Sequence, residues 1–143
     1  MQQNKLDLVI KKYLKVLKLR PDYTVAVYNL GIALDNQGKT DEAIPYFLKA
    51  LKDMPQNADA FFKTANAFFK TGDSESAIIY YQKAIRINPD FVNAHCNLGV
   101  LLFQKGDIDG AVSSFKAALK LQLDFKPAQQ YLKKTMMVRS KKL

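Results

Sequence analysis

Three residue types with distinctive chemistry are scarce in this sequence, whose 143 residues include one cysteine, one histidine and no tryptophan. A single cysteine, Cys96, cannot form a disulfide within the chain. One cysteine and one histidine also provide too few ligands for a zinc site of the usual kind. We therefore predict neither a metal site nor a bound cofactor.

Long apolar runs are absent as well. No segment approaches the roughly 18 consecutive apolar residues of a membrane-spanning helix, and the first residues, MQQNKLDLVIKK, lack the apolar stretch and cleavage site of a secretory signal. With 48% hydrophobic and 24% charged residues, the composition is typical of a globular protein. We expect a single soluble domain, residues 1–143, in the cytoplasm or at the cytoplasmic face of an organelle.

The net charge of +9 is concentrated at the two ends of the chain. Residues 1–20 contain six Lys or Arg and one Asp, and residues 126–143 contain six Lys or Arg and no acidic residue. Residues 21–125 contain ten basic and twelve acidic residues. Binding to phosphates needs several cations on one surface, and no basic stripe runs along the middle of the chain. This distribution indicates solvated terminal helices and does not favour a nucleic-acid partner.

A pattern of 34 residues occurs three times without insertion or deletion, at 24–57, 58–91 and 92–125. Each repeat divides at a central glycine into two amphipathic stretches of about 14 residues, and acidic residues open the second stretch. The pattern predicts a helical hairpin for each repeat. The aligned positions are Gly38, Gly72 and Gly106; Ala43, Ala77 and Ala111; Phe47, Tyr81 and Phe115; and Ala50, Ala84 and Ala118.

Gly31 is unusual because it interrupts the apolar stretch of a predicted helix, where glycine costs about 1 kcal/mol relative to alanine. The equivalent positions in the next two repeats are Ala65 and Gly99, so this position has only very small side chains. We predict that the two helices of the hairpin cross closely here. Replacement of Gly31 by Leu is expected to destabilise the fold, whereas replacement by Ala is expected to be tolerated or even to stabilise it, as Ala65 suggests.

The period of 34 residues and the conserved spacing of its small and aromatic residues resemble the tetratricopeptide repeat (TPR) family. Leu30–Gly31 and Leu98–Gly99 match the Leu-Gly pair of that family, and Phe68 stands at its aromatic position. Pro55 and Pro89 close two of the repeats. The sequence departs from the family pattern at three places. The tryptophan position holds Val27, Phe61 and His95, the second Leu-Gly pair is replaced by Thr64 and Ala65, and the last proline is replaced by Leu123.

The segments on either side of the three repeats extend the same pattern. Residues 4–21 match the second helix of an incomplete repeat whose first helix is absent, and Pro21 falls on the closing position. Residues 126–143 begin like another first helix, with Pro127 suited to its first turn, and then become rich in Lys, as expected of a polar capping helix. The predicted fold class is an all-α solenoid of three full TPRs, an N-terminal half repeat and a C-terminal basic capping helix.

In TPR proteins the first helices of successive repeats line a concave groove that holds an extended or helical segment of a partner. The resemblance therefore implies a protein or peptide partner for this chain, and exposed aromatic residues in a groove are typical of a binding surface. The alternative is that neighbouring repeats cover part of this surface. The predicted groove residues are Tyr28, Asn29, Ile32, Phe62, Lys63, Asn66, Phe69, Asn97, Val100, Phe103 and Tyr131.

Two specialised TPR binding modes make different use of such a groove. The chaperone-binding clamp holds a C-terminal carboxylate with Lys, Asn and Arg, but its first-repeat Lys and Asn positions are Tyr28 and Ile32 here. The clamp is therefore not present, although Lys63 and Asn66 could still hold a single acidic group. Superhelical TPRs bind the main chain of the ligand with a ladder of asparagines. Asn29 and Asn97 fit that ladder, whereas Lys63 interrupts it.

Three functions remain open at this point. The first is a non-catalytic interaction module, since the sequence shows no nucleophile with a neighbouring base, no phosphate-binding loop and no paired carboxylates. The second is a self-assembling scaffold on a cytoplasmic or organelle surface, because the segment LGIALDNQGKTDEAI is similar to TPR scaffolds that coat bacterial magnetosomes. The third is the TPR part of a larger enzyme. Self-association is expected through an apolar stripe of the half repeat that includes Leu6, Ile10, Tyr13 and Leu17.

Overall fold

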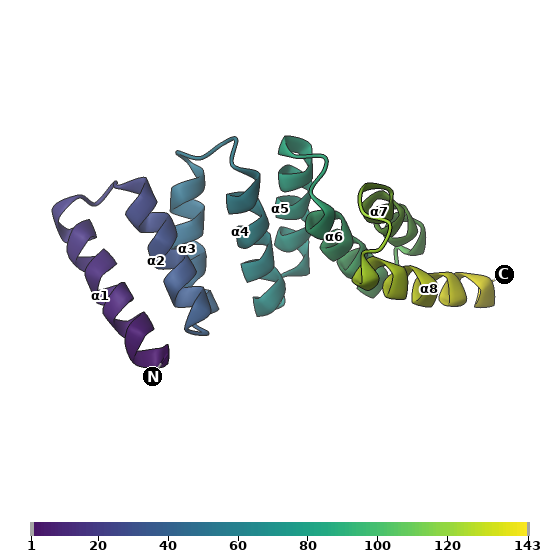
Figure 1. The fold of residues 1–143 in the computed structure, drawn as a ribbon, viewed down its shortest axis with the longest axis horizontal. Coiled ribbons are helices and arrows are strands. Elements are labelled where there is room, and N and C mark those ends of the chain that lie inside the picture. Colours follow the sequence, from purple (N-terminus) through teal and green to yellow (C-terminus); the bar gives the residue numbers. More distant parts are fainter. Residues whose placement is uncertain (1, 143) are drawn as a thin grey trace. The chain divides into compact units, whose positions relative to one another are not determined.

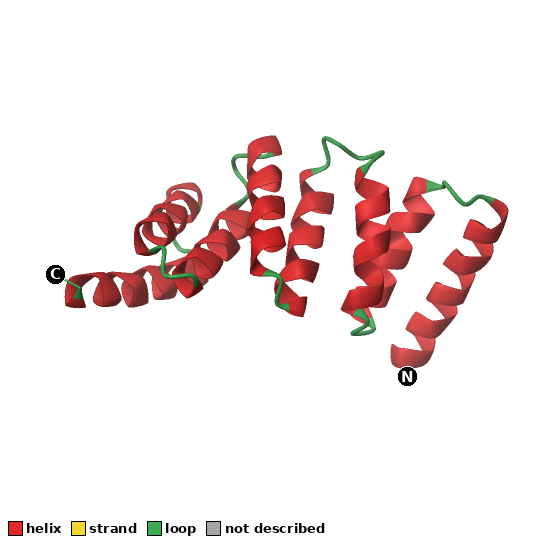
Figure 2. Ribbon diagram, turned by 180° about the vertical axis from the view of Figure 1, so that it is seen from behind, coloured by secondary structure: helices red, strands yellow, loops and turns green. Residues whose placement is uncertain are grey.

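The computed structural model describes residues 2–142, which form eight α-helices and no strand (Figures 1 and 2). The predicted all-α solenoid of helical hairpins is confirmed. In chain order the helices are α1 (Gln2–Leu19), α2 (Thr24–Asn36), α3 (Thr40–Leu51), α4 (Ala58–Thr71), α5 (Ser74–Ile87), α6 (Val92–Gln104), α7 (Ile108–Leu121) and α8 (Lys126–Lys141).

The helices correspond to the sequence repeats. The pairs α2 and α3, α4 and α5, and α6 and α7 fall within the three 34-residue repeats, while α1 and α8 fall within the N-terminal half repeat and the capping segment. The contacts divide the chain after Ala77 into two compact units, and this boundary lies inside α5. Residues up to Ala77 are called unit 1 below, and residues from Ile78 onwards are called unit 2.

Unit 1 is built around the packing of α1 on α2, of α2 on α3 and of α3 on α4. Its core contains small side chains beside large ones, so that the helices approach one another closely. Three side chains of α1 pack against this core from one side, although no residue of α1 is itself buried. The buried core residues are Leu30, Leu34, Ala43, Phe47 and Ala67, and the contributions from α1 are Ile10, Tyr13 and Leu17.

The predicted close crossing within the hairpin is found at Gly31. A Cβ atom added to Gly31 would lie 2.9 Å from both Cδ1 and Cε1 of Phe47, which is buried in α3. In unit 2, a Cβ atom at Gly99 would lie 2.7 Å from Cε1 of Phe115. These distances correct the expectation that alanine is simply tolerated at Gly31, because a methyl group would require the buried ring of Phe47 to move.

The turn inside each hairpin is closed by the predicted glycine, and the second helix that follows is capped differently from repeat to repeat. Gly38 has a φ of 84°, a left-handed value that suits glycine. At the start of α5, Asp73 accepts a hydrogen bond from the backbone N–H of Ser76 at 3.0 Å. The equivalent residue before α3 is Lys39, which makes no side-chain capping bond. The first of the three repeats therefore lacks a cap that the second has.

Unit 2 contains the remainder of α5 together with α6, α7 and α8, and α7 packs against both α6 and α8. Aromatic residues at the edge of its core include Phe103 and Tyr131. The capping helix α8 is anchored by buried Ala128 and Thr135, while its charged residues are exposed. The buried core residues of this cluster are Cys96, Val100, Ala111, Phe115, Ala118 and Ala128.

Candidate partner-binding surface

The predicted groove residues all lie on the first helices of the hairpins or on the capping helix. In unit 1, α2 carries Tyr28, Asn29 and Ile32, and α4 carries Phe62, Lys63, Asn66 and Phe69. In unit 2, α6 carries Asn97, Val100 and Phe103, and α8 carries Tyr131. The residues of each compact unit are described in turn.

Two polar bridges join α2 to α4 in unit 1. The Tyr28 hydroxyl donates a hydrogen bond to Oδ2 of Asp59 at 3.0 Å. About two helical turns further along α2, Oδ2 of Asp35 lies 2.7 Å from Nζ of Lys70 in an ion pair. Oδ1 of Asp35 accepts a second bond, at 2.8 Å, from the hydroxyl of Thr40. These bridges hold two helices that are not consecutive in the chain.

A cavity of about 230 Å³ opens on α2 and α4 near the Asp35–Lys70 ion pair. It brings together three of the predicted groove residues, Ile32, Lys63 and Asn66. Phe47, a core residue of the repeat pattern, also forms part of the cavity wall. The complete lining is Ile32, Asp35, Asn36, Phe47, Lys63, Asn66 and Lys70.

The lining of this cavity carries two positive charges and one negative charge, and they differ in whether they are paired. The carboxylate of Asp35 is paired with Lys70, whereas Lys63 takes part in none of the ion pairs that the structure describes among residues 2–142. The cavity therefore has one positive charge that no ion pair compensates.

The hydroxyl of Tyr28 stays protonated. Burial, and then the nearby negative charge of Asp59, raise the pKa of Tyr28 above its ordinary value, so its hydroxyl remains a proton donor.

The aromatic residues of unit 1 differ in how much surface they offer. The ring of Tyr28 packs on that of Phe47 at 5.9 Å between centroids, so Tyr28 belongs partly to the edge of the core. Phe62 is half-buried, and Phe69 is 37% exposed. Asn29 is half-buried on α2. Phe69 is thus the aromatic residue of this surface that is most open to a ligand.

In unit 2 the predicted groove residues are engaged in internal contacts. Nδ2 of Asn97 donates a hydrogen bond to the hydroxyl of Tyr81 at 3.2 Å, and burial raises the pKa of Tyr81 to about 12. The ring of Tyr131 stacks on Phe115 with centroids 5.7 Å apart. Phe103 is half-buried. A ligand would meet only the remaining exposed parts of these side chains.

The assignment of Val100 to the groove is corrected by the structure. Val100 is only 9% exposed and belongs to the buried core cluster that includes Phe115. The physical reason is the packing of α8, whose Tyr131 lies against the same cluster. Cys96 is buried there as well, and burial raises the pKa of its thiol. Neither side chain offers appreciable surface to a partner.

The residues predicted to mediate self-association are divided between two environments. Ile10, Tyr13 and Leu17 pack against the core of unit 1 on one side and remain partly exposed on the other. Leu6 lies one helical turn before Ile10 and lines a separate cleft with Val9. Most of the predicted stripe is therefore already used within the chain.

Two further kinds of feature, a metal-binding cluster and a membrane-spanning helix, can be checked in the part of the chain that the structure describes. No group of three or more His, Cys, Asp or Glu side chains within residues 2–142 is placed to hold a metal ion. Over the same residues, none of the helices combines the length and apolar character that crossing a membrane requires.

Comparison with known proteins identifies a family and several similar folds. A family model described as tetratricopeptide repeat matches residues 1–58, 28–90 and 62–129. No curated protein matches the sequence. Among solved structures, the chain is similar to MamA protein, with 24% identity and a TM-score of 0.92 over 97% of this chain and 76% of that one.

Two further structures of similar fold are described with a peptide-binding site or a bound peptide. One is YrrB, described as a TPR protein with an unusual peptide-binding site, with 26% identity and a TM-score of 0.86 over 96% of this chain and 71% of that one. The other is the first TPR of Spaghetti (RPAP3) bound to the HSP90 peptide SRMEEVD, with 22% identity and a TM-score of 0.78 over 82% of this chain and 93% of that one.

Proposed function

Since the chain belongs to the tetratricopeptide repeat family, we propose that it is a non-catalytic module that binds a segment of a partner protein. The binding surface proposed is the one formed by the first helices of the repeats. Two proteins of similar fold, YrrB and the Spaghetti TPR, are described with a peptide-binding site and with a bound peptide. Their descriptions support this class of function.

The observation that carries the proposal is the cavity on α2 and α4. Its lining is mostly polar and includes the amide of Asn66 and the charge of Lys63, beside the apolar side chains of Ile32 and Phe47. An acidic side chain of the partner would be held at Lys63, with an apolar neighbour against Ile32.

The backbone of the partner must be recognised by side chains, because the backbone groups of α2 and α4 are used within the helices. An amide side chain can donate and accept hydrogen bonds without selecting a particular ligand side chain. Asn29 on α2 is the candidate in unit 1, and Asn97 is its counterpart in unit 2. Phe69, which is 37% exposed, would provide an apolar anchor.

The proposal can be tested with a peptide array in which the central residue of each peptide is acidic, neutral or basic. We expect the acidic peptides to bind best, and we expect Lys63→Glu to reverse this preference. Lys52→Glu is the matched control, since Lys52 is exposed in unit 1, undergoes the same charge change and does not line the cavity. A binding profile that is the same for both variants would remove Lys63 from the site.

Self-assembly as a scaffold on a cytoplasmic or organelle surface is the second candidate. It is favoured by α1, none of whose residues is buried although Leu6, Ile10 and Tyr13 form an apolar stripe. A second copy could cover the side of this stripe that faces away from the core. Light scattering should show a mass that rises with concentration and that falls in Leu6→Lys; an unchanged monomeric mass in both proteins would exclude this candidate.

A further inference from the structure

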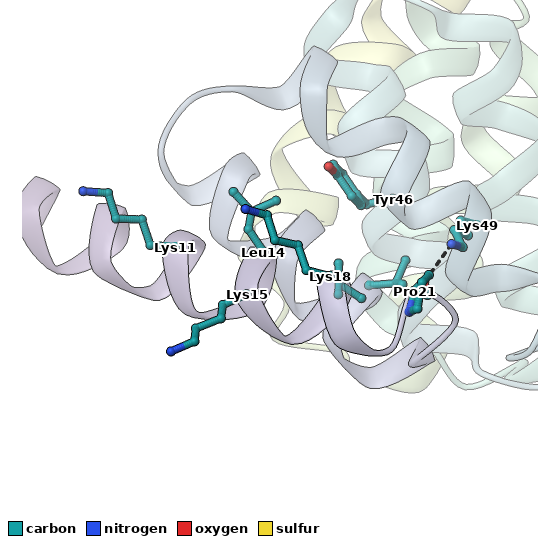
Figure 3. Close-up of a pocket in the computed structure, with 9 residues that line it drawn as sticks. Lys11, Leu14, Lys15, Lys18, Pro21, Tyr46 and Lys49 are labelled. Atoms are coloured by element: carbon teal, nitrogen blue, oxygen red, sulfur yellow. Dashed lines mark hydrogen bonds between the residues drawn. The ribbon is translucent and has the colours of Figure 1, made fainter.

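A larger cleft in unit 1 lies between α1 and α3 and shares no lining residue with the cavity on α2 and α4 (Figure 3). Its volume is about 860 Å³, within the range of roughly 300–1,000 Å³ that is common for ligand sites. The lining is Lys11, Leu14, Lys15, Leu17, Lys18, Pro21, Val27, Tyr46 and Lys49. The cleft thus combines apolar and basic side chains and contains no acidic one.

The apolar part of the cleft is accessible from outside. Leu14 of α1 is 42% exposed, whereas a leucine that served only the core would be buried. Tyr46 of α3 is half-buried opposite α1. Lys11 and Lys18 lie three residues before and four residues after Leu14, so the three side chains share one face of α1. Figure 3 shows these three side chains on the same side of the helix.

The basic part of the cleft is largely uncompensated. Nζ of Lys49 lies 2.8 Å from the carbonyl oxygen of Pro21 and 3.3 Å from the carboxylate of Asp22, so its charge is already partnered. Lys11 and Lys18 take part in none of the ion pairs described among residues 2–142. A ligand with acidic groups on both sides of an apolar strip would match this arrangement.

We propose that the cleft between α1 and α3 binds an acidic amphipathic helix of a partner protein. Both walls are helices whose backbone hydrogen bonds are internal, so a β-strand cannot be added to them, and a single aromatic residue, Tyr46, is too few for a polyproline groove. A helix presents apolar residues at three- and four-residue spacing and acidic residues beside them. Lys11 and Lys18 are about 10 Å apart along α1 at roughly 1.5 Å per residue, which corresponds to two turns of the bound helix.

Two other occupants fit the cleft less well. The first helix of a second copy would bring six Lys or Arg and one Asp in residues 1–20 to a cleft that is already basic, and like charges repel. An anionic lipid surface would attract the lysines, but it would not fill a recess whose wall includes Val27, which is 1% exposed. An acidic helix satisfies both the charge and the shape.

The test uses two synthetic amphipathic peptides of the same length, one with Leu on one face and Glu on the other, and one with every Glu replaced by Lys. Each is titrated to millimolar concentration into the ¹⁵N-labelled protein, and amide shifts are followed by NMR. We expect the acidic peptide to shift the amides of Leu14, Leu17 and Tyr46. We expect it to bind at least about tenfold more tightly than the basic peptide, and more weakly at high salt.

The matched variants are Leu14→Glu and the control Lys12→Glu. Leu14→Glu should weaken binding of the acidic peptide by about tenfold or more, as loss of an apolar anchor does. Lys12 is exposed on the same helix but does not line the cleft. Reversing its charge should therefore change the affinity for the acidic peptide by about twofold or less. Both positions are exposed, and circular dichroism should show that both variants remain folded.

Several results would overturn the proposal. Absence of shifts around Leu14 at millimolar peptide would do so, as would equal binding of the two peptides. Shifts confined to Lys63 and Asn66 would place the peptide in the cavity on α2 and α4, which supports the proposed function but rejects this second site. Binding of phosphatidylserine vesicles in place of the peptide would identify a lipid surface. A concentration-dependent mass that Leu14→Glu abolishes would identify a second copy as the occupant.

Discussion

Alanine at Gly99 is expected to destabilise the protein, although alanine usually strengthens a helix. A Cβ atom at this position would lie 2.7, 2.9 and 3.0 Å from three ring carbons of Phe115, a side chain with no exposed surface. Real Cβ atoms essentially never approach another heavy atom as closely as the shortest of these distances. The ring must therefore move within a packed core, and the helix propensity of alanine is set against the cost of that movement.

The magnitude follows from two opposing contributions. Replacing glycine by alanine in a helix interior gains about 1 kcal/mol, whereas overpacking a well-packed core costs roughly 1–3 kcal/mol. For Gly99→Ala the net free energy of unfolding should fall by about 1 kcal/mol. The effect at Gly31 should be smaller, because the closest contacts there are 2.9 Å to two ring carbons of Phe47. Leucine at either position should cost about 2–3 kcal/mol.

The assay is urea unfolding followed by circular dichroism, with a double-mutant cycle that joins Gly99→Ala to Phe115→Leu. If the ring is the obstacle, the smaller side chain should relieve it, with a coupling energy of about 1 kcal/mol. Gly106→Ala is the control. No heavy atom lies within 4 Å of an added Cβ there, but the φ of 83° is strained for alanine, so its cost should not depend on Phe115. A stabilising Gly99→Ala, or a coupling near zero, would refute the steric explanation.

Three further predictions concern capping, acid stability and binding. Lys39→Asp should stabilise the protein by about 1 kcal/mol in the same assay, because it supplies the side-chain cap that α3 lacks; no gain would mean that this turn cannot adopt the capping geometry. Hydrogen bonds from Ser76 lower the pKa of Asp73, so its contribution is present above the ordinary carboxyl pKa of about 4 and is lost as the pH falls through the lowered value. The stability deficit of Asp73→Asn should therefore shrink in acid, and a constant deficit from neutral to acidic pH would contradict this. Phe69→Ala should weaken peptide binding by about 2 kcal/mol with little change in melting temperature; joint loss of folding and binding would assign the ring to the core.

The fold could be predicted from the sequence because the same pattern of small residues, aromatic residues and turn glycines occurs three times. Small residues at Gly31, Ala65 and Gly99 permit close helix crossings, and an uninterrupted period places every turn and helix in register. The structure confirms the hairpins and the turn glycines on this basis. The sequence did not reveal how tightly each crossing is packed, since the tolerance of Gly31 for alanine depends on tenths of an ångström between its backbone and Phe47.

The candidate site was only partly predictable, because equivalent positions in a repeat do not have equivalent surroundings. Ile32, Asn66 and Val100 occupy the same place in successive repeats. Ile32 and Asn66 line the cavity of unit 1, whereas Val100 is buried in unit 2, where α8 contributes Tyr131 to the same cluster. The repeat pattern gives the register of a residue but not how closely the next helix covers it.

The polar bridges of unit 1 join residues whose separation in the sequence is close to one repeat period. Tyr28 and Asp59 are 31 residues apart, and Asp35 and Lys70 are 35 apart, both close to the period of 34. In a tandem repeat, residues about one period apart become lateral neighbours, so a donor and an acceptor at this separation are candidates for a bridge. Within unit 1, the residue one period before Lys63 is Asn29, which is not acidic. Lys63 takes part in none of the ion pairs described among residues 2–142, and we expect it to meet an acidic group of a partner.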